Sequence, residues 1–440
     1  MSLPSFKGIV KSSVEYYYIW MDTLGRSPPI GDRPRLGIRE NLGQFMLLVA
    51  VNGLVGAFVG QERMLVPLFG ERIFALRSTT AVLLFIVTFG IAKAVSNLAA
   101  GALADRVGRK RILMAGWAVG LPVPLILMIA PSWSWVVAAN ILLGINQGLT
   151  WSITVMMKID LAGPRHRGLA MGLNEFSGYL AVGLSAAATG ALAARYGLRP
   201  EPLFLGLAIA ALGLGVSGFF VKETSGHVEI ENNGAPRKSF REIVWLTSLG
   251  DTRLAALSRT GLVNNANDAH AWGLLPLLLV AQGLSTAQIG LVAAAYPVTW
   301  GIGQLFTGAL SDRIGRRIPI ASGMWIQAGA LLGFALTEGL AAGATFAILL
   351  GIGTALTYPA LLAAVGDEAE PGWRAGAIGV YRTWRDSGYV IGALAAGAMA
   401  DLFDLRIALG VVAVATALLG FDAWVHLRPD SSSDNLNSVG

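Results

Sequence analysis

The stretch GALADRVGRK, residues 101–110, lies between two long apolar runs and returns as GALSDRIGRR at residues 308–317. Seven of the first nine positions are identical, and the second copy begins 207 residues after the first. The repeat extends beyond this turn, because the same offset aligns LLGI at 142–145 with LLGI at 349–352. A short basic turn between apolar runs, used twice at a fixed interval, indicates an internally duplicated membrane protein.

The composition also indicates a membrane protein. Apolar residues make up 54% of the 440 residues and charged residues only 14%, against about 25% charged in an average protein. Apolar runs of about 20 residues recur along the chain, and each can cross a bilayer as a helix. The net charge of +6 reflects arginines beside these runs, so we expect no nucleic-acid partner. The absence of cysteine excludes disulfides and thiol catalysis.

These runs predict an all-α membrane protein with twelve transmembrane helices in two pseudo-symmetric six-helix bundles. The expected domains are an N-terminal segment with an interfacial helix at 1–40, a bundle at 41–222, a linker at 223–252 with a short surface helix, a bundle at 253–428 and a tail at 429–440. The twelve predicted spans are 42–66, 79–103, 112–130, 133–157, 167–193, 202–221, 254–280, 287–310, 318–337, 341–364, 375–400 and 406–426.

The distribution of lysine and arginine predicts the orientation. With an even number of spans, both termini lie on one side, and that side carries 23 Lys/Arg against five on the other. Because positive loops stay inside, both termini are expected in the cytoplasm. The sequence thus predicts a multi-pass protein of the plasma (inner) membrane with a cytoplasmic linker.

With these motifs the chain resembles the major facilitator superfamily of secondary transporters, from about residue 42 to residue 427. The loop at 101–110 is similar to the signature of that family, and the copy at 308–317 matches as well. The resemblance implies a monomer in the lipid bilayer, a small-molecule substrate, a proton or other coupling ion, and a gate formed by the two loops. The candidate gate residues are Gly101, Asp105, Arg106, Gly108, Arg109, Asp160, Arg167, Gly308, Asp312, Arg313, Gly315, Arg316, Asp367 and Arg374.

Asp105 gives the gate a physical basis. It ends a predicted helix at the membrane edge, where it could cap the positive N-terminus of a helix from the other bundle. Asp160 with Arg167, and Asp367 with Arg374, are expected to be companion parts of the same lock. The alternative is that these charges only hold the turns in the cytoplasm.

Two departures from the family weaken the interpretation as a drug/proton antiporter. Such antiporters often carry an arginine in the fourth span, four residues before a glycine, whereas this chain has Asn140 before Gly144. Their glycine-proline pattern in the fifth span, followed by paired glycines, is missing around residues 178–183.

Ionisable residues inside the predicted spans form the candidate site, because charges at membrane depth are costly and usually functional. At about 1.5 Å per helical residue, Lys93, Glu175, Asp268 and Arg382 each lie about 10–20 Å from the end of a span. Glu175 and Arg382 are equivalent at the 207 offset, so one duplicated position carries opposite charges. With polar neighbours at helical spacing, the candidates are Lys93, Asn97, Asn140, Gln147, Trp151, Glu175, Asn264, Asp268, Trp272, Arg382, Arg385 and Asp386.

The charges avoid particular spans. The predicted third, sixth and ninth spans carry no ionisable residue, and the twelfth carries only Asp422. In the family, the third helix of each triplet packs on the outside, so the resemblance implies that the charged helices line the cavity. Glu62 and Arg63 lie toward the outer end of the first span and are expected to mark only the cavity mouth.

Three interpretations of the buried charges remain open. In the structural one, Arg382 neutralises Asp386 within one helix and Lys93 is tied to Glu175. In the second, the charges contact the substrate, and the slight excess of cations favours an anionic or zwitterionic solute. In the third, Glu175 or Asp268 couples transport to protons, because burial favours the neutral form of a carboxylate.

We therefore predict a secondary active transporter that moves a small solute, an organic anion or zwitterion, by alternating access with proton coupling, in symport. The alternative is a drug/proton efflux antiporter for amphipathic compounds. No loop of the form Gly-x-x-x-x-Gly-Lys-Ser/Thr occurs in the sequence, which argues against ATP drive within this chain. We expect neither an enzyme nor a cofactor or metal site, because the four histidines are scattered without ligand spacing. A non-transporting receptor or scaffold would have little use for two gate loops.

Overall fold

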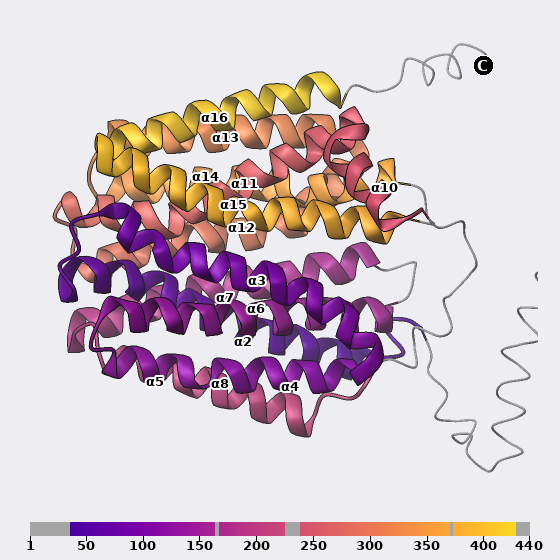
Figure 1. Cartoon of the computed structure of the whole chain (residues 1–440), viewed down its shortest axis with the longest axis horizontal. Coiled ribbons are helices and arrows are strands. Elements are labelled where there is room, and N and C mark those ends of the chain that lie inside the picture. Colours follow the sequence, from indigo (N-terminus) through magenta and orange to yellow (C-terminus); the bar gives the residue numbers. More distant parts are fainter. Residues whose placement is uncertain (1–35, 163–166, 225–237, 370–372, 428–440) are drawn as a thin grey trace, which may run out of the picture.

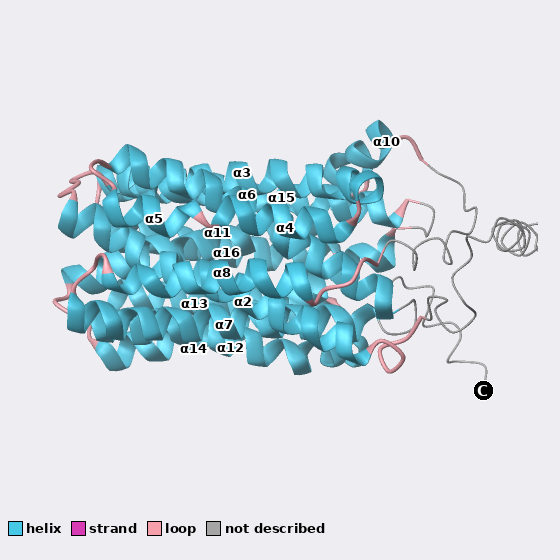
Figure 2. Ribbon diagram, turned by 90° about the horizontal axis from the view of Figure 1, so that it is seen from below, coloured by secondary structure: helices cyan, strands magenta, loops and turns pink. Residues whose placement is uncertain are grey.

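The computed structural model describes residues 36–162, 167–224, 238–369 and 373–427. In this part of the chain the regular structure is helical (Figure 2). The first six membrane-length segments are α2 (Leu42–Leu68), α3 (Thr79–Val107), α4 (Arg109–Gly120) with its continuation α5 (Pro122–Ile129), α6 (Trp133–Ala162), α7 (Arg167–Tyr196) and α8 (Glu201–Phe219). The second six are α11 (Thr252–Ala281), α12 (Thr286–Ile314), α13 (Arg317–Leu336), α14 (Leu340–Glu368), α15 (Arg374–Leu402) and α16 (Leu405–His426).

The two sets of six form two bundles that lie one above the other in Figure 1, with their helices along the long axis. Helices α3 and α7 of the N-terminal bundle pack against α15 and α12 of the C-terminal bundle. Helices α4, α5 and α8 lie at one outer edge, and α13 and α16 lie at the other (Figure 1). Of the outer helices, α4 with α5, α8 and α13 carry no charge within their predicted spans, whereas α3, α7 and α15, which carry several of the internal charges, face the other bundle.

Ten of the described helical segments are long and apolar enough to cross a membrane. Helices α11 and α15 have membrane length but are not among the ten, because polar and charged residues make them less apolar than the others. Most of α11 is nevertheless buried in the protein, including Asn264, Asn265, Asn267 and Asp268. Polar helices are tolerated at membrane depth where neighbouring helices shield them from lipid. The fold is the expected all-α membrane protein, with the polar helix α11 held inside the protein.

The repeated stretch closes corresponding turns in the two bundles. Gly108, between α3 and α4, has φ +94°, and Gly315, between α12 and α13, has φ +82°. This left-handed region favours glycine, which explains the glycine at both positions of the motif. We call the end of the molecule that carries these two turns the linker end (right in Figure 1), and the opposite end the far end.

A short surface helix stands at the linker end. Helix α10 (Phe240–Trp245) starts at Ser239, whose side chain accepts a hydrogen bond from the Glu242 amide, and continues into a π-helical turn at Leu246–Gly250. Trp384 Nε1 donates to Ser248 Oγ at 2.8 Å, which fixes this turn against α15. The expected interfacial helix of residues 1–40 falls almost wholly outside the described residues, as do 225–237 of the linker and the tail from 428.

At the far end, one carboxylate joins the two bundles. Asp401, in the last turn of α15, accepts hydrogen bonds from Ser78 Oγ at 2.7 Å and from the backbone amides of Thr79 and Thr80 at 2.5 and 3.1 Å. These amides belong to the first turn of α3, so a residue of the C-terminal bundle caps a helix of the N-terminal bundle. Such a cap satisfies donors that a helix leaves unpaired at its start.

A close approach of two helices continues the interface toward the middle of the molecule. A Cβ on Gly190 of α7 would lie 2.8 Å from Cα of Gly290 in α12, and the reverse holds as well. Further along the same pair of helices, the rings of Tyr179 and Trp300 stack with centroids 3.5 Å apart. The bundles are thus in close contact over the far half of α7 and α12.

Candidate functional site

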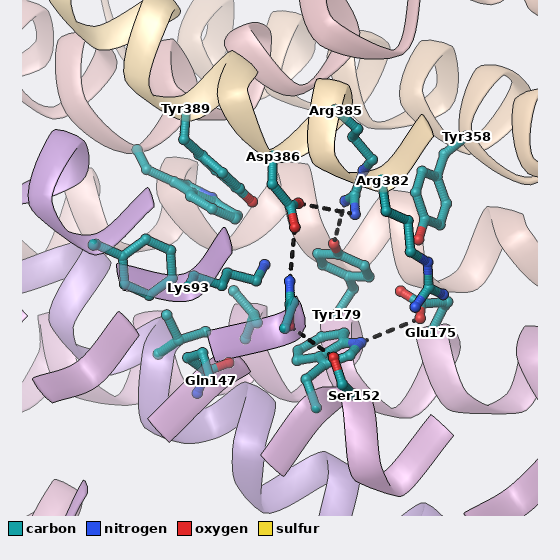
Figure 3. Close-up of a pocket in the computed structure, with 16 residues that line it drawn as sticks. Lys93, Gln147, Ser152, Glu175, Tyr179, Tyr358, Arg382, Arg385, Asp386 and Tyr389 are labelled. Atoms are coloured by element: carbon teal, nitrogen blue, oxygen red, sulfur yellow. Dashed lines mark hydrogen bonds and ion pairs between the residues drawn. The ribbon is translucent and has the colours of Figure 1, made fainter. Parts of the chain in front are cut away.

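A pocket lies between the two bundles, near the middle of the helices, and holds about 590 Å³ of empty space including its mouth. Helices α2, α3, α6 and α7 line it from one bundle, and α11, α14 and α15 from the other (Figure 3). The lining consists of Val59, Phe89, Lys93, Asn97, Gln147, Trp151, Ser152, Glu175, Tyr179, Val182, Trp272, Tyr358, Arg382, Arg385, Asp386 and Tyr389.

A hydrogen-bond chain crosses the pocket from one bundle to the other. Ser152 Oγ donates to Asn97 Oδ1 at 2.7 Å, and Asn97 Nδ2 donates to Asp386 Oδ2 at 2.8 Å. Lys93 lies one turn before Asn97, midway along α3, and its side chain extends toward the same region (Figure 3). The chain links α6, α3 and α15, so movement of the bundles would break it.

Two opposite charges face each other beside this chain. Glu175 is 3% exposed and accepts hydrogen bonds from Trp151 Nε1 at 3.2 Å and from Asn174 Nδ2 at 2.9 Å. Arg382 reaches from the other bundle toward the Glu175 carboxylate (Figure 3). The two positions that the repeat relates in sequence therefore lie opposite each other in space.

Arg385 forms the third cationic group. Its Nη1 lies 3.6 Å from Asp386 Oδ1, and its Nη2 contacts the Tyr179 hydroxyl at 3.5 Å. The guanidinium lies over the ring of Tyr358, 4.4 Å from the centroid. With Lys93 and Arg382, the pocket holds three cationic side chains and two carboxylates within aromatic walls.

Nine of the twelve candidate residues from the sequence line the pocket, and three lie outside it. Asn140 donates to the Val136 carbonyl of its own helix. Asn264 accepts from Gln327 Nε2 at 2.9 Å inside the C-terminal bundle. Asp268 is fully buried and accepts a hydrogen bond from the Tyr296 hydroxyl.

Among the described residues, neither structural pairing expected from the sequence is an ion pair. Asp386 is paired with Arg385 instead of Arg382, and Glu175 is held by Trp151 and Asn174 instead of Lys93. The reason is geometric, because Arg382 points across the interface, away from its own helix (Figure 3).

The sequence reasoning missed several lining residues that the repeat could have identified. Tyr358 lies 207 residues after Trp151, and Asp386 lies 207 residues after Tyr179. Tyr179 also follows Glu175 by four residues, on the same face of α7. Ser152 and the apolar residues carry no comparable signal.

The expected position of Glu62 and Arg63 at the cavity mouth is wrong. They are 1% and 3% exposed, and α2 continues past them to Leu68 and then into a π-helical turn, Phe69–Ile73. They lie in the last two turns of α2, as the predicted span 42–66 implies, but inside the protein.

Candidate gate residues form matching ion pairs in the two bundles. Arg109 Nε lies 2.5 Å from Asp160 Oδ2, and Arg316 Nε lies 2.9 Å from Asp367 Oδ2, so the pairing is repeated at the 207 offset. Each pair ties the start of the third segment of a bundle to the end of the fourth. The side chains of Asp105, Arg106, Arg167 and Arg374 lie outside the described residues, so the expected partners of Asp160 and Asp367 are not seen.

Arg316 also contacts Asp312 Oδ1 at 2.5 Å. Burial lowers the pKa of Arg316, but its hydrogen bonds to Asp367 and Asp312 outweigh this effect and raise the pKa above its usual value. Arg313 is exposed beside it, and Gly308 has open space where a Cβ would stand.

A sequence model of the Major Facilitator Superfamily matches residues 42–262 and 257–440. Multidrug resistance protein MdtG of Salmonella heidelberg (strain SL476) is 26% identical over 354 residues, which cover 79% of this chain and 85% of the relative. The 3-(3-hydroxy-phenyl)propionate transporter of Escherichia coli (strain K12) is 28% identical over 282 residues, 61% of this chain and 60% of the relative.

Solved structures share the fold. The nucleoside transporter NupG superposes with a TM-score of 0.71 at 13% identity, covering 88% of this chain and all of that one. A bacterial homolog of the human lysosomal transporter Spinster, crystallised in an inward-facing and unoccupied conformation, gives a TM-score of 0.71 at 14% identity over 88% of this chain and 97% of that one.

Proposed function

The chain belongs to the Major Facilitator Superfamily of membrane transporters, and from this premise we propose that its central pocket carries a small organic anion or zwitterion across the membrane by alternating access. The observation that carries this proposal is the charge of the pocket. Lys93, Arg382 and Arg385 outnumber Glu175 and Asp386, and the charges come from both bundles. A solute bound there contacts both halves at once, so its release follows when they separate.

The walls favour a solute with an aromatic or similarly flat part. Trp151, Tyr179, Trp272, Tyr358 and Tyr389 surround the charged groups. Rings can stack on these faces while a carboxylate binds the cations. The name of one relative, a 3-(3-hydroxy-phenyl)propionate transporter, describes a solute of this class. We therefore infer an aromatic carboxylate as the substrate class.

The alternative is efflux of amphipathic compounds in exchange for protons, and the similarity to MdtG favours it. The same aromatic walls would accept such compounds, and the Glu175 carboxylate would attract a cationic one. The excess of cations in the pocket is the reason we place this function second.

We further propose proton coupling in symport, with Glu175 or Asp268 as the proton carrier. Both carboxylates are at least nine-tenths buried, and Asp268 Oδ2 has no hydrogen-bond partner in the described part of the chain. A carboxylate that loses and regains a proton alters the charge of the site by one unit. This change would link solute binding to a proton gradient.

We place the protein in the inner membrane, with the linker end and both termini in the cytoplasm. The 23-to-5 bias of Lys/Arg supports this orientation, and one relative is named inner membrane transport protein YnfM. Because Asp401 and the glycine contact of α7 and α12 join the bundles at the far end, we assign the structure to a state closed toward the outside.

Uptake into proteoliposomes tests the function. Labelled 3-(3-hydroxyphenyl)propionate should accumulate faster under an inwardly directed proton gradient, whereas tetraphenylphosphonium, an amphipathic cation, should not accumulate faster under a proton gradient of either direction. Arg382→Gln should lower carboxylate uptake about tenfold or more, since a hydrogen bond to a charged group contributes about 1.5–3 kcal/mol. The matched control is Arg259→Gln in α11, whose guanidinium pairs with Asp422 at 2.8 Å outside the pocket. Transport of the cation and not the carboxylate would favour the alternative.

A further inference from the structure

Arg63 lies beside the pocket, one helical turn nearer the far end. Val59 lines the pocket, and Arg63 follows it by four residues on the same face of α2. The Arg63 side chain is 3% exposed. Its guanidinium carbon lies 4.1 Å from the ring centroid of Phe89 and 5.0 Å from that of Trp272, two residues that also line the pocket. The aromatic layer of Phe89 and Trp272 thus lies between the pocket and Arg63.

The guanidinium of Arg63 is buried with its donors unused. Its Nε, Nη1 and Nη2 atoms have no hydrogen-bond partner among the described residues. The carboxylates of Glu62 and Asp268 act on it electrostatically, but neither forms an ion pair with it in the described part of the chain. The rings offset part of the cost by cation–π attraction, about 2 kcal/mol when desolvated. A buried guanidinium without acceptors remains costly, so a ligand that supplied two acceptor oxygens would be favoured.

The aromatic rings that cover Arg63 come from both bundles. Phe85 and Phe89 belong to α3, and Arg63 belongs to α2. Both helices are part of the N-terminal bundle. Trp272 belongs to α11 of the C-terminal bundle and stacks on Tyr389 of α15, with centroids 5.6 Å apart and an interplanar angle of 17°. If the far end opens, Trp272 and Tyr389 leave together with their bundle, and the guanidinium becomes accessible from the outside.

We propose that Arg63 is a second anion-binding group of the transport path, which binds the carboxylate of the solute when the protein is open at the far end. This proposal rests on the proposed transport of an organic anion. Arg382 and Arg385 bind the carboxylate in the state closed at the far end, and Arg63 binds it in the opposite state. The aromatic layer between the two positions opens and closes with the bundles.

Exchange assays on oriented proteoliposomes test the proposal, with 3-(3-hydroxyphenyl)propionate as the probe. Arg63→Gln should raise the half-saturating concentration at the far face about tenfold or more, because a paired guanidinium contributes at least the 1.4 kcal/mol of one tenfold step. The half-saturating concentration at the linker face should stay within about twofold of that of the wild-type protein. Arg63→Lys should give a half-saturating concentration at the far face between those of the wild-type and Arg63→Gln proteins, since lysine keeps the charge and loses the bidentate geometry. Equal changes at both faces, or none, would overturn the proposal.

A second variant distinguishes a loss of affinity caused by the missing positive charge from one caused by a disturbed structure. The chain contains no cysteine, so Arg63→Cys introduces a unique thiol. Modification from the far face with a methanethiosulfonate carrying an ethylammonium group should restore far-face affinity, whereas the ethylsulfonate reagent should not. Equal effects of the two reagents would also overturn the proposal. Wild-type protein that moves no carboxylate from either face would instead refute the proposed function, so the two failures are distinguishable.

Discussion

Removal of the Asp401 carboxylate is predicted to release the far end. This carboxylate accepts three hydrogen bonds from Ser78, Thr79 and Thr80 of the other bundle. Loss of an aspartate cap at a helix N-terminus costs about 0.5–2 kcal/mol, typically about 1 kcal/mol. Because this cap exists only while the far end is closed, the whole loss acts on the equilibrium between closed and open states. Asp401→Ala should therefore increase the open fraction about fivefold, and about 30-fold at most.

A single cysteine can report this shift, because the chain has none of its own. Leu83 is 1% exposed and packs across the interface, where a Cβ on Gly273 would lie 2.3 Å from its Cδ2 atom. In a Leu83→Cys background, a membrane-impermeant maleimide added at the far face should react about five times faster with the Asp401→Ala protein.

The matched control is Asp404→Ala. Asp404 also caps a helix, accepting from the Ile407 amide at 2.8 Å, but that helix, α16, belongs to its own bundle. This variant should leave the labelling rate unchanged. If the two substitutions altered labelling equally, the carboxylate of Asp401 would not hold the bundles together, and the reasoning would be refuted.

Two further predictions concern the interface and the coupling. Gly190→Ala places a Cβ 2.8 Å from the backbone Cα of Gly290, a clash that rotation of a side chain cannot relieve. Because such overpacking costs about 1–3 kcal/mol in the state closed at the far end, it should speed labelling of Leu83→Cys at least fivefold. The control Gly172→Ala, on the same helix with open space around it, should leave the labelling rate unchanged. Glu175→Gln and Asp268→Asn remove the buried carboxylates, so at least one should exchange labelled solute normally yet fail to accumulate it under a proton gradient; accumulation at the wild-type level in both would exclude them as proton carriers.

The sequence predicts the fold well, because the fold depends on features that repeat. The stretch at 101–110 and its copy at 308–317 identify the duplication, and the apolar runs between them place the helices. Membrane crossing needs only a length of apolar residues, and that length is visible in a single sequence. The predicted first span, 42–66, ends close to the observed end of α2 at Leu68, but the burial of Glu62 and Arg63 depends on the helices packed around them and is not visible in the sequence.

The site was predictable to the extent that charge is costly in a membrane. This argument identified Lys93, Glu175, Arg382 and Arg385, which all line the pocket. It could not predict partners, because partners depend on the rotation of each helix about its axis and on contacts between bundles. Asp268 shows the limit, since a buried charge at midplane can serve a network inside one bundle.

The most direct test of the central claim uses Ser152→Cys, a small change at a residue that lines the pocket and is 8% exposed. An impermeant thiol reagent added at the linker face should stop uptake of 3-(3-hydroxyphenyl)propionate, and saturating solute should slow the modification severalfold. Full modification, confirmed by mass spectrometry, with undiminished uptake would contradict a transport path through this pocket.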